Sequence, residues 1–245
     1  KIKMSTNQSL LQVGGIEAVV LYGPVKTLHL NVLPPAGKVR VTAPQNMNDD
    51  AIRTFLATRI SWIKKMQAKF KGQERQTPRE YVSGETYYFF GKKYKLEVLE
   101  TDATPSVEIK GKKKILLTVR PKTSILRREE IMQDWYRNEL QKFLENAIEK
   151  WEKKIGVKVN DWSIRRMKTR WGTCNHKKKN ILFNLELAKK PESCIEYVIL
   201  HELLHLIEEK HSEKFTALLG KYMPKWKSEK EELNRLILSY EEWKK

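Results

Sequence analysis

The sequence predicts an α+β fold in which a β-rich first part is followed by a second part of mixed strands and helices. Three observations lead to this class. Short β-prone segments with turn residues between them recur from residue 28 to 119, a long apolar helical stripe begins after Ser124, and further β-prone segments alternate with helical ones beyond it. The change of pattern at residues 121–124 predicts two regions, 1–122 and 123–245.

The first expected elements are a hairpin and a helix. In VKTLHLNVL (25–33), apolar residues alternate with polar ones, and PPAG supplies a turn before VRVTA (39–43). This pattern predicts two paired strands, with His29 facing away from the core. Apolar residues then recur three and four apart between residues 52 and 66, which predicts one amphipathic helix capped by Asn48.

Two further hairpins are expected before residue 122. The segments TYYFFGKKYKLEVLE (86–100) and SVEIKGKKKILLTV (106–119) each place a Gly-Lys turn between β-prone stretches. The aromatic cluster at residues 87–90 lies inside the first of them. We interpret this cluster as packing within a sheet, since large aromatic side chains dominate core burial.

The second region is expected to open with a long helix. Its apolar stripe follows Ser124 and is closed by Gly156. The β-prone stretches WSIRRMK (162–168) and ILFNLEL (181–187) are then expected to pair across the loop between them. Helices should follow around residue 200, after His211 and within 227–243, and the sequence shows no evident internal repeat.

Composition limits the classes of partner and location. The 245 residues carry a formal net charge of +18, which makes nucleic acids or nucleotides plausible partners. However, the lysines are spread along the chain and no nucleic-acid-binding module surrounds them, so solvated hairpin tips and loops are the favoured explanation. No apolar run approaches a membrane span and the first residues lack a signal-peptide core, so we expect a cytoplasmic protein without membrane association.

The segment CIEYVILHELLHLIEEKHSEKF (194–215) holds three of the five histidines of the chain. Residues four apart share one helix face, so His201 and His205 can present two imidazoles to one metal ion. Glu202 lies beside them, where its carboxylate can take a proton from water held at the open position of the ion. This HExxH arrangement on an apolar helix predicts a catalytic metal site, with zinc as the expected ion.

A catalytic zinc usually has three protein ligands, so a third is required. His211 lies ten residues after His201, the offset found in the metzincin pattern HExxHxxGxxH, but Glu208 occupies the glycine position. We therefore expect the helix to continue to about Lys210, with His211 reaching back from the next helix, which Ser212 would cap. The alternative third ligand is a glutamate of SEKEE (228–232).

Three further residues are candidates for substrate binding. Arg170 can hold an anionic group or stabilise an oxyanion, or it can serve structure alone. Tyr197 lies one turn before His201 on the same helix face, where it either contacts the site or packs. Asn184 interrupts the apolar stretch 181–187, which we expect to be the sheet edge that receives an extended substrate.

Four sequence blocks together resemble the YgjP-like metallopeptidase domain, a family of predicted zinc-dependent hydrolases related to the SprT and WLM type. The blocks cover roughly the last third of the chain: MKTRWGTCN (167–175), ILFNLELAKKP (181–191), IEYVILHELLHLIEEKHSEKF (195–215) and MPKWK (223–227). The resemblance implies an α+β zincin-like catalytic part, three histidine ligands at 201, 205 and 211, and Glu202 as the catalytic carboxylate. Thr173 departs from the serine usual in such families.

The sequence therefore predicts a zinc-dependent hydrolase that most resembles a peptidase acting on proteins or peptides. One alternative keeps the metal but acts on nucleotides or other phosphate esters, with Arg170 and the lysines supplying affinity for anions. Another alternative is a non-catalytic nucleic-acid-binding module with a structural metal. Glu202 argues against the latter, because a structural site has no need of that carboxylate.

Overall fold

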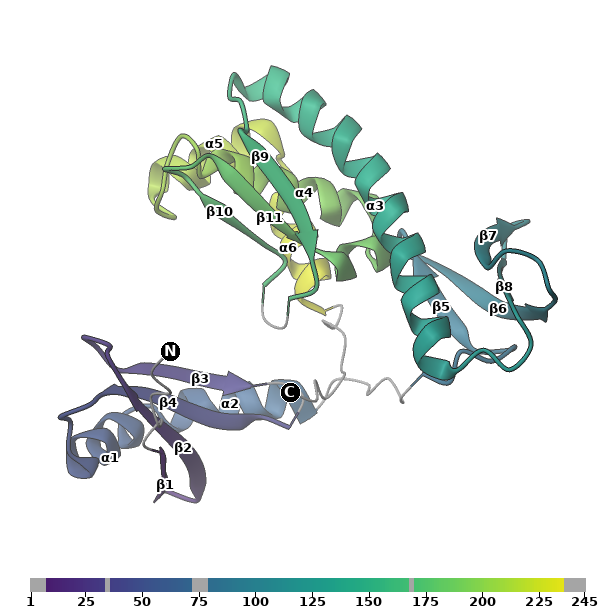
Figure 1. Cartoon of the computed structure of the whole chain (residues 1–245). Coiled ribbons are helices and arrows are strands. Elements are labelled where there is room, and N and C mark those ends of the chain that lie inside the picture. Colours follow the sequence, from purple (N-terminus) through teal and green to yellow (C-terminus); the bar gives the residue numbers. More distant parts are fainter. Residues whose placement is uncertain (1–7, 34–35, 72–78, 168–169, 236–245) are drawn as a thin grey trace, which may run out of the picture. The chain divides into compact units, whose positions relative to one another are not determined.

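The computed structural model describes residues 8–33, 36–71, 79–167 and 170–235. Both strands and helices occur throughout these residues, which confirms the predicted α+β class (Figure 1). The chain divides into two compact units: the first takes in residues 1–77 and 240–245, and the second residues 78–239. The regions expected from the sequence are 1–122 and 123–245, with the boundary where strands give way to a long helix. The boundary between the two compact units lies earlier in the chain.

The first unit is a four-stranded sheet with two helices. Its strands lie in the order β1-β2-β4-β3: both outer pairs are antiparallel hairpins and the central pair, β2 with β4, is parallel. The predicted hairpin is β3 with β4, and His29 is exposed as expected. The elements of this unit are β1 (Gln8–Val13), β2 (Ile16–Gly23), β3 (His29–Leu33), β4 (Lys38–Pro44), α1 (Asp49–Ala57) and α2 (Ile60–Lys71).

The single helix expected between residues 52 and 66 is wrong, since the structure has two helices there. Asn48 caps α1 as predicted, by accepting a hydrogen bond from the Ala51 amide. The helix then breaks because the Arg59 amide donates to the Leu56 carbonyl, three residues back, instead of continuing the helical pattern. Buried apolar residues of both helices join one core, so the apolar spacing continues across the break and hides it in the sequence.

The second unit begins with another four-stranded sheet. Its strands lie in the order β5-β6-β8-β7, again with two antiparallel hairpins joined by a parallel central pair. Both predicted hairpins are present, and the strands are β5 (Thr86–Phe89), β6 (Lys92–Glu100), β7 (Ser106–Lys110) and β8 (Lys114–Val119). The two sheets thus share one strand order and one pairing pattern, and each is followed by a helix. This structural repeat was not evident in the sequence.

Helix α3 (Ile125–Ile155) is the long helix expected after Ser124. The Ser124 side chain accepts a hydrogen bond from the Arg127 amide, and Gly156 ends the helix with a φ of 73°. At 1.5 Å per residue its 31 residues span about 46 Å, so it packs on the β5–β8 sheet near its start and against α4 farther on. No described helix is both long enough and apolar enough to cross a membrane.

A third, small sheet, one short 3₁₀ helix and three α-helices follow in the described part of the second unit (Figure 1). The two strands predicted around residues 162–168 and 181–187 do pair, in parallel, but the loop between them contributes a further strand. In the order β10-β11-β9, the segment at 181–184 is central, so its expected place at the sheet edge is wrong; β10 and β9 are the edge strands. The elements are β9 (Asp161–Arg165), β10 (Gly172–Asn175), β11 (Asn180–Asn184), the 3₁₀ helix η1 (Leu185–Lys189), α4 (Glu192–Leu204), α5 (Glu213–Tyr222) and α6 (Trp226–Arg235).

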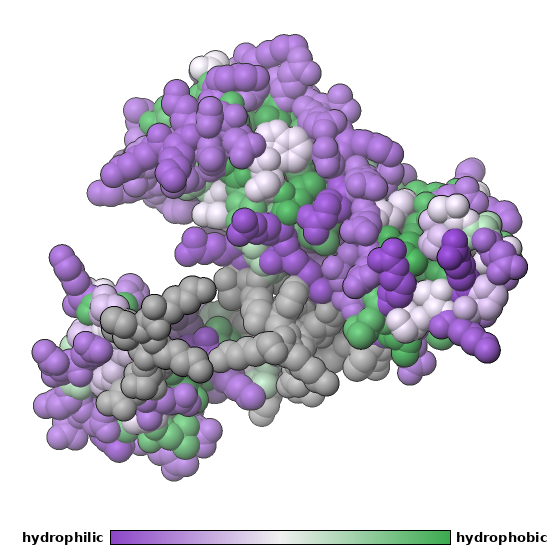
Figure 2. All heavy atoms as spheres, viewed as in Figure 1, coloured by the Kyte–Doolittle hydropathy of each residue, from purple (hydrophilic) through white to green (hydrophobic). Residues whose placement is uncertain are grey.

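The surface of each unit is mainly hydrophilic on the face shown in Figure 2, in keeping with the 32% of charged residues. The helix expected within 227–243 is present as α6, and its last expected residues, 236–243, lie outside the described residues. Of the aromatic cluster at 87–90, Tyr87, Phe89 and Phe90 pack as predicted, whereas Tyr88 is exposed. Phe89 lies against Trp135 of α3 with ring centroids 4.8 Å apart.

The tip of the β5–β6 hairpin anchors the start of helix α4. The Phe90 amide donates to the Ala188 carbonyl at 2.9 Å. At the next residue, Gly91 has a φ of +76°, and a Cβ atom there would lie 2.9 Å from the Pro191 Cα atom. Glycine is therefore needed at this turn for both its backbone conformation and its close approach to α4.

Replacing Gly91 with alanine should destabilise the second unit. The matched control is Gly111→Ala: Gly111 also has a positive φ, of +64°, but nothing lies within 4 Å of a Cβ atom there. The control should lose about 1 kcal/mol from backbone strain, and Gly91→Ala a further 1–3 kcal/mol from the clash. Denaturant unfolding measures both changes, and equal losses would show that the contact with Pro191 is unimportant.

Candidate metal centre

The candidate site lies at the end of helix α4, which is buried because α3, α5, α6 and β10 all pack against it. The helix ends at Leu204, and His205 is its C-cap, so the expected continuation to Lys210 is wrong. The Leu206 and Ile207 amides donate to the carbonyls three residues before them, which tightens the last turn and ends the α-helix. Glu208 is not among the residues with positive φ, so this turn does not require the glycine that we considered necessary.

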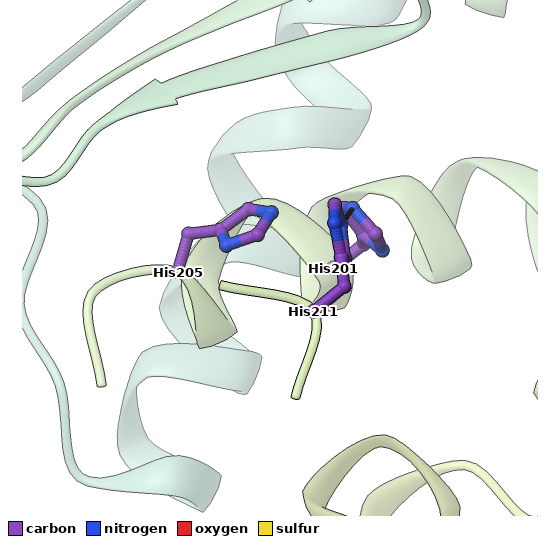
Figure 3. Close-up of side chains that lie close together, drawn as sticks. All are labelled: His201, His205 and His211. Atoms are coloured by element: carbon purple, nitrogen blue, oxygen red, sulfur yellow. Dashed lines mark hydrogen bonds between the residues drawn. The ribbon is translucent and has the colours of Figure 1, made fainter. Parts of the chain in front are cut away.

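The turn brings three imidazole rings together (Figure 3). One ring nitrogen from each of His201, His205 and His211 lies within 4.8 Å of the others, a group of atoms that can hold a metal ion. The Nε2 atoms of His201 and His211 lie 3.0 Å apart. Among the described residues, no carboxylate joins this group, and Glu229 of the alternative segment 228–232 accepts a hydrogen bond from Ser193 instead.

Hydrogen bonding and burial prepare two of these rings for a cation. The Nδ1 atom of His205 lies 3.1 Å from the Glu208 carbonyl, to which it can donate, leaving Nε2 free. Burial lowers the pKa of His201 to about 3, and it also lowers the pKa of His205. Both rings are therefore neutral at neutral pH, the form in which imidazole binds metals.

Phe215 forms an apolar wall against all three histidines. Its ring centroid lies 5.0 Å from that of His201, 4.8 Å from His205 and 5.0 Å from His211. Ser212 caps α5 by accepting from the Phe215 amide, as predicted, and so fixes this ring. The sequence did not reveal this role of Phe215, because an apolar residue gives no chemical sign that it lies beside a polar site.

Glu202 is buried next to the histidines, on the side of β10. Burial raises the pKa of its carboxyl to about 8, and the nearby Arg170 guanidinium opposes that rise. A Cβ atom on Gly172 would lie 2.7 Å from the Glu202 Oε1 atom, so only glycine leaves room for this carboxylate. A cleft of about 430 Å³ opens over Glu202 and the three histidines.

The remaining candidates occupy different positions. Arg170 is exposed and lines this cleft. Tyr197 is buried, with its ring centroid 5.8 Å from that of His201. Asn184 is fully buried and is not part of the cleft lining; its side-chain amide donates to the Met167 and Arg170 carbonyls. Its contacts hold the chain on either side of Arg170 in place.

The buried Glu202 predicts a pH dependence in the metal-free protein. Its pKa is about 8 when folded and near 4.5 when unfolded, so unfolding releases a proton between these values. Stability from this group is therefore lost as the pH rises from about 4.5 to 8. Glu202→Gln removes the effect.

The free energy of unfolding of the variant, minus that of the parent, should thus increase with pH across this range. Denaturant unfolding in the presence of a chelator measures the difference, and slopes from other groups cancel because both proteins share them. A difference that does not change with pH contradicts the assignment.

Comparison with known proteins identifies the family. A family model described as "YgjP-like, metallopeptidase domain" matches residues 26–236, far more than the last third in which the resemblance was noted. The crystal structure of the metallopeptidase zymogen of Pyrococcus abyssi abylysin is 23% identical, with a TM-score of 0.35, over 37% of this chain and 90% of that one. No curated protein matches the sequence significantly. The family model spans most of the chain, so the expected class of metal-dependent hydrolase is confirmed and this protein belongs to the YgjP-like metallopeptidase domain family.

Proposed function

We propose that this protein is a zinc-dependent peptidase in which His201, His205 and His211 hold the ion and Glu202 acts as general base. The observation that carries the proposal is the convergence of three ring nitrogens within 4.8 Å beside a buried carboxylate. In a tetrahedral zinc site with bonds of about 2.0–2.1 Å, ligand nitrogens lie about 3.3 Å apart. The spacing of the three rings therefore suits zinc after small side-chain movements.

The chain's own residues supply the proton transfers. A zinc ion, when bound, would act as a Lewis acid that makes water nucleophilic near neutral pH. Glu202 faces the same cleft as the histidines, so it can accept the proton of the attacking water and then donate it to the leaving amine. Burial raises the pKa of Glu202 in the metal-free protein, and a bound cation would favour the ionised carboxylate, which is the form that accepts a proton.

The edge strand β10 is the proposed docking site for an extended peptide. Its backbone is paired on one side only, with β11, in the described part of the chain. It packs against α4, and Gly172 at its start contacts Glu202. A peptide that adds to β10 as a further strand would thus lie over Glu202, with its backbone held by hydrogen bonds that do not depend on sequence.

The alternatives from the sequence receive less support. The family match favours a protein or peptide substrate over nucleotides. A structural metal normally has four protein ligands, whereas three rings beside an open cleft match a catalytic site. Association with nucleic acid rests only on the net charge of +18, and the cytoplasmic location stays a prediction.

Glu202→Gln tests the mechanism. The amide cannot accept the proton, so turnover of a casein-type substrate should fall roughly 10²- to 10⁴-fold. Zinc content, measured by elemental analysis, should stay the same, because Glu202 is not among the proposed ligands. Peptide cleavage at the parental rate by the variant would sink the mechanism, and nucleoside triphosphate hydrolysis that disappears in the variant would move the assignment to a phosphohydrolase.

His211→Ala tests the third ligand. Loss of one of three ligands should lower zinc affinity by at least about tenfold and abolish stoichiometric zinc after dialysis. The control is His176→Ala, because His176 lines the same cleft but is not part of the cluster. Retention of one zinc per chain in His211→Ala, together with loss on replacing a glutamate of residues 228–232, would favour the alternative ligand.

A further inference from the structure

A second cavity, of about 210 Å³, lies beside the candidate metal centre. It is lined from three directions: by Arg170 and Trp171 before β10, by Tyr197 and His201 of α4, and by Lys230 of α6. Because His201 and Glu202 line this cavity as well as the cleft over the histidines, a peptide lying along β10 can place one group in it while its backbone passes Glu202.

The cavity combines apolar walls with two cations. Trp171, Tyr197 and Leu233 supply aromatic and aliphatic surface, and Leu233 is buried. Arg170 and Lys230 are both exposed, and within the described residues neither forms an ion pair. Lys189 of the same unit, by contrast, lies 2.8 Å from the Glu186 carboxylate.

The charge at the cavity is unbalanced. Glu202 is the one acidic side chain among the described lining residues, and it also lines the cleft over the three histidines. Glu229, next to Lys230 in the chain, accepts a hydrogen bond from the Ser193 hydroxyl at 2.7 Å. An arriving carboxylate would therefore meet two cations and one acidic group, Glu202, with which Arg170 already interacts. Hydrogen bonds between ionised partners are about twice as strong as neutral ones.

We propose that this cavity is a specificity pocket for a carboxylate of the peptide substrate, held by Lys230 and Arg170 next to the scissile bond. The carboxylate belongs either to an aspartate or glutamate side chain or to the carboxyl terminus of the peptide. The aromatic walls of Trp171 and Tyr197 take the aliphatic stem that precedes it. This assignment rests on the proposed peptidase function and adds the class of substrate to it.

Lys230 is the residue to change, because Arg170 also lines the cleft over Glu202 and its replacement would disturb catalysis. The test variant is Lys230→Glu. The control is Lys227→Glu, which makes the same change of charge at an exposed position of the same helix outside the cavity lining. Unfolding curves of the three proteins verify that each variant is folded.

The first measurement is cleavage of a pool of random decapeptides, with free or amidated carboxyl termini, analysed by mass spectrometry. The parent should prefer aspartate and glutamate at one position beside the cut, or should cut next to free carboxyl termini only; the two results distinguish the two sources of the carboxylate. For matched peptides with and without that carboxylate, Lys230→Glu should reduce the kcat/KM ratio about tenfold or more, and Lys227→Glu should leave it unchanged.

The second measurement separates this inference from the proposed function. Calorimetry records the binding of the same matched peptides to Glu202→Gln, with and without Lys230→Glu. Cleavage without any preference for a carboxylate, or a preference that survives Lys230→Glu, overturns the pocket while the peptidase stands. Carboxylate-selective binding that needs Lys230, without cleavage by the parent, supports the pocket and overturns the peptidase. Absence of both selectivity and cleavage overturns both.

Discussion

The cost of burying ionisable groups on helix α4 governs this site. An isolated charge in an apolar interior is expensive, so such groups change their protonation state or acquire a partner. Burial accordingly keeps His201 neutral and raises the pKa of Glu202. In the proposed zinc form, attraction between the cation and the ionised Glu202 would offset the free-energy cost of burying each charge. Groups that are costly to bury alone would therefore be stable together.

The parts of this site that depend on local spacing could be predicted from the sequence. Two histidines four apart share a helix face whatever surrounds them, and Ser212 marks the start of α5. The end of α4 could not be predicted, because it follows from three-residue hydrogen bonds after Leu204 and not from a breaking residue. Strand β10 was missed because its sequence, GTCN, has no alternating pattern and gains its pairing from β11.

Contacts between distant segments were equally hidden. Phe215 and Lys230 come from helices that the sequence predicts, but only tertiary packing places the first against three histidines and the second at a cavity. The approach of Gly91 to Pro191 joins residues a hundred positions apart. Periodicity describes which face of a helix is apolar, and it carries no information about which distant segment covers that face.

The shared strand order of the β1–β4 and β5–β8 sheets has an evolutionary consequence. Two segments with the same hairpins, the same central parallel pair and a capped helix after the fourth strand are what tandem duplication of one ancestral segment produces. The later copy contacts the segment that leads into the helix bearing the histidines, through Phe90 and Gly91. The earlier copy has a hydrophobic core of its own, to which the helix that bears the histidines contributes no residue.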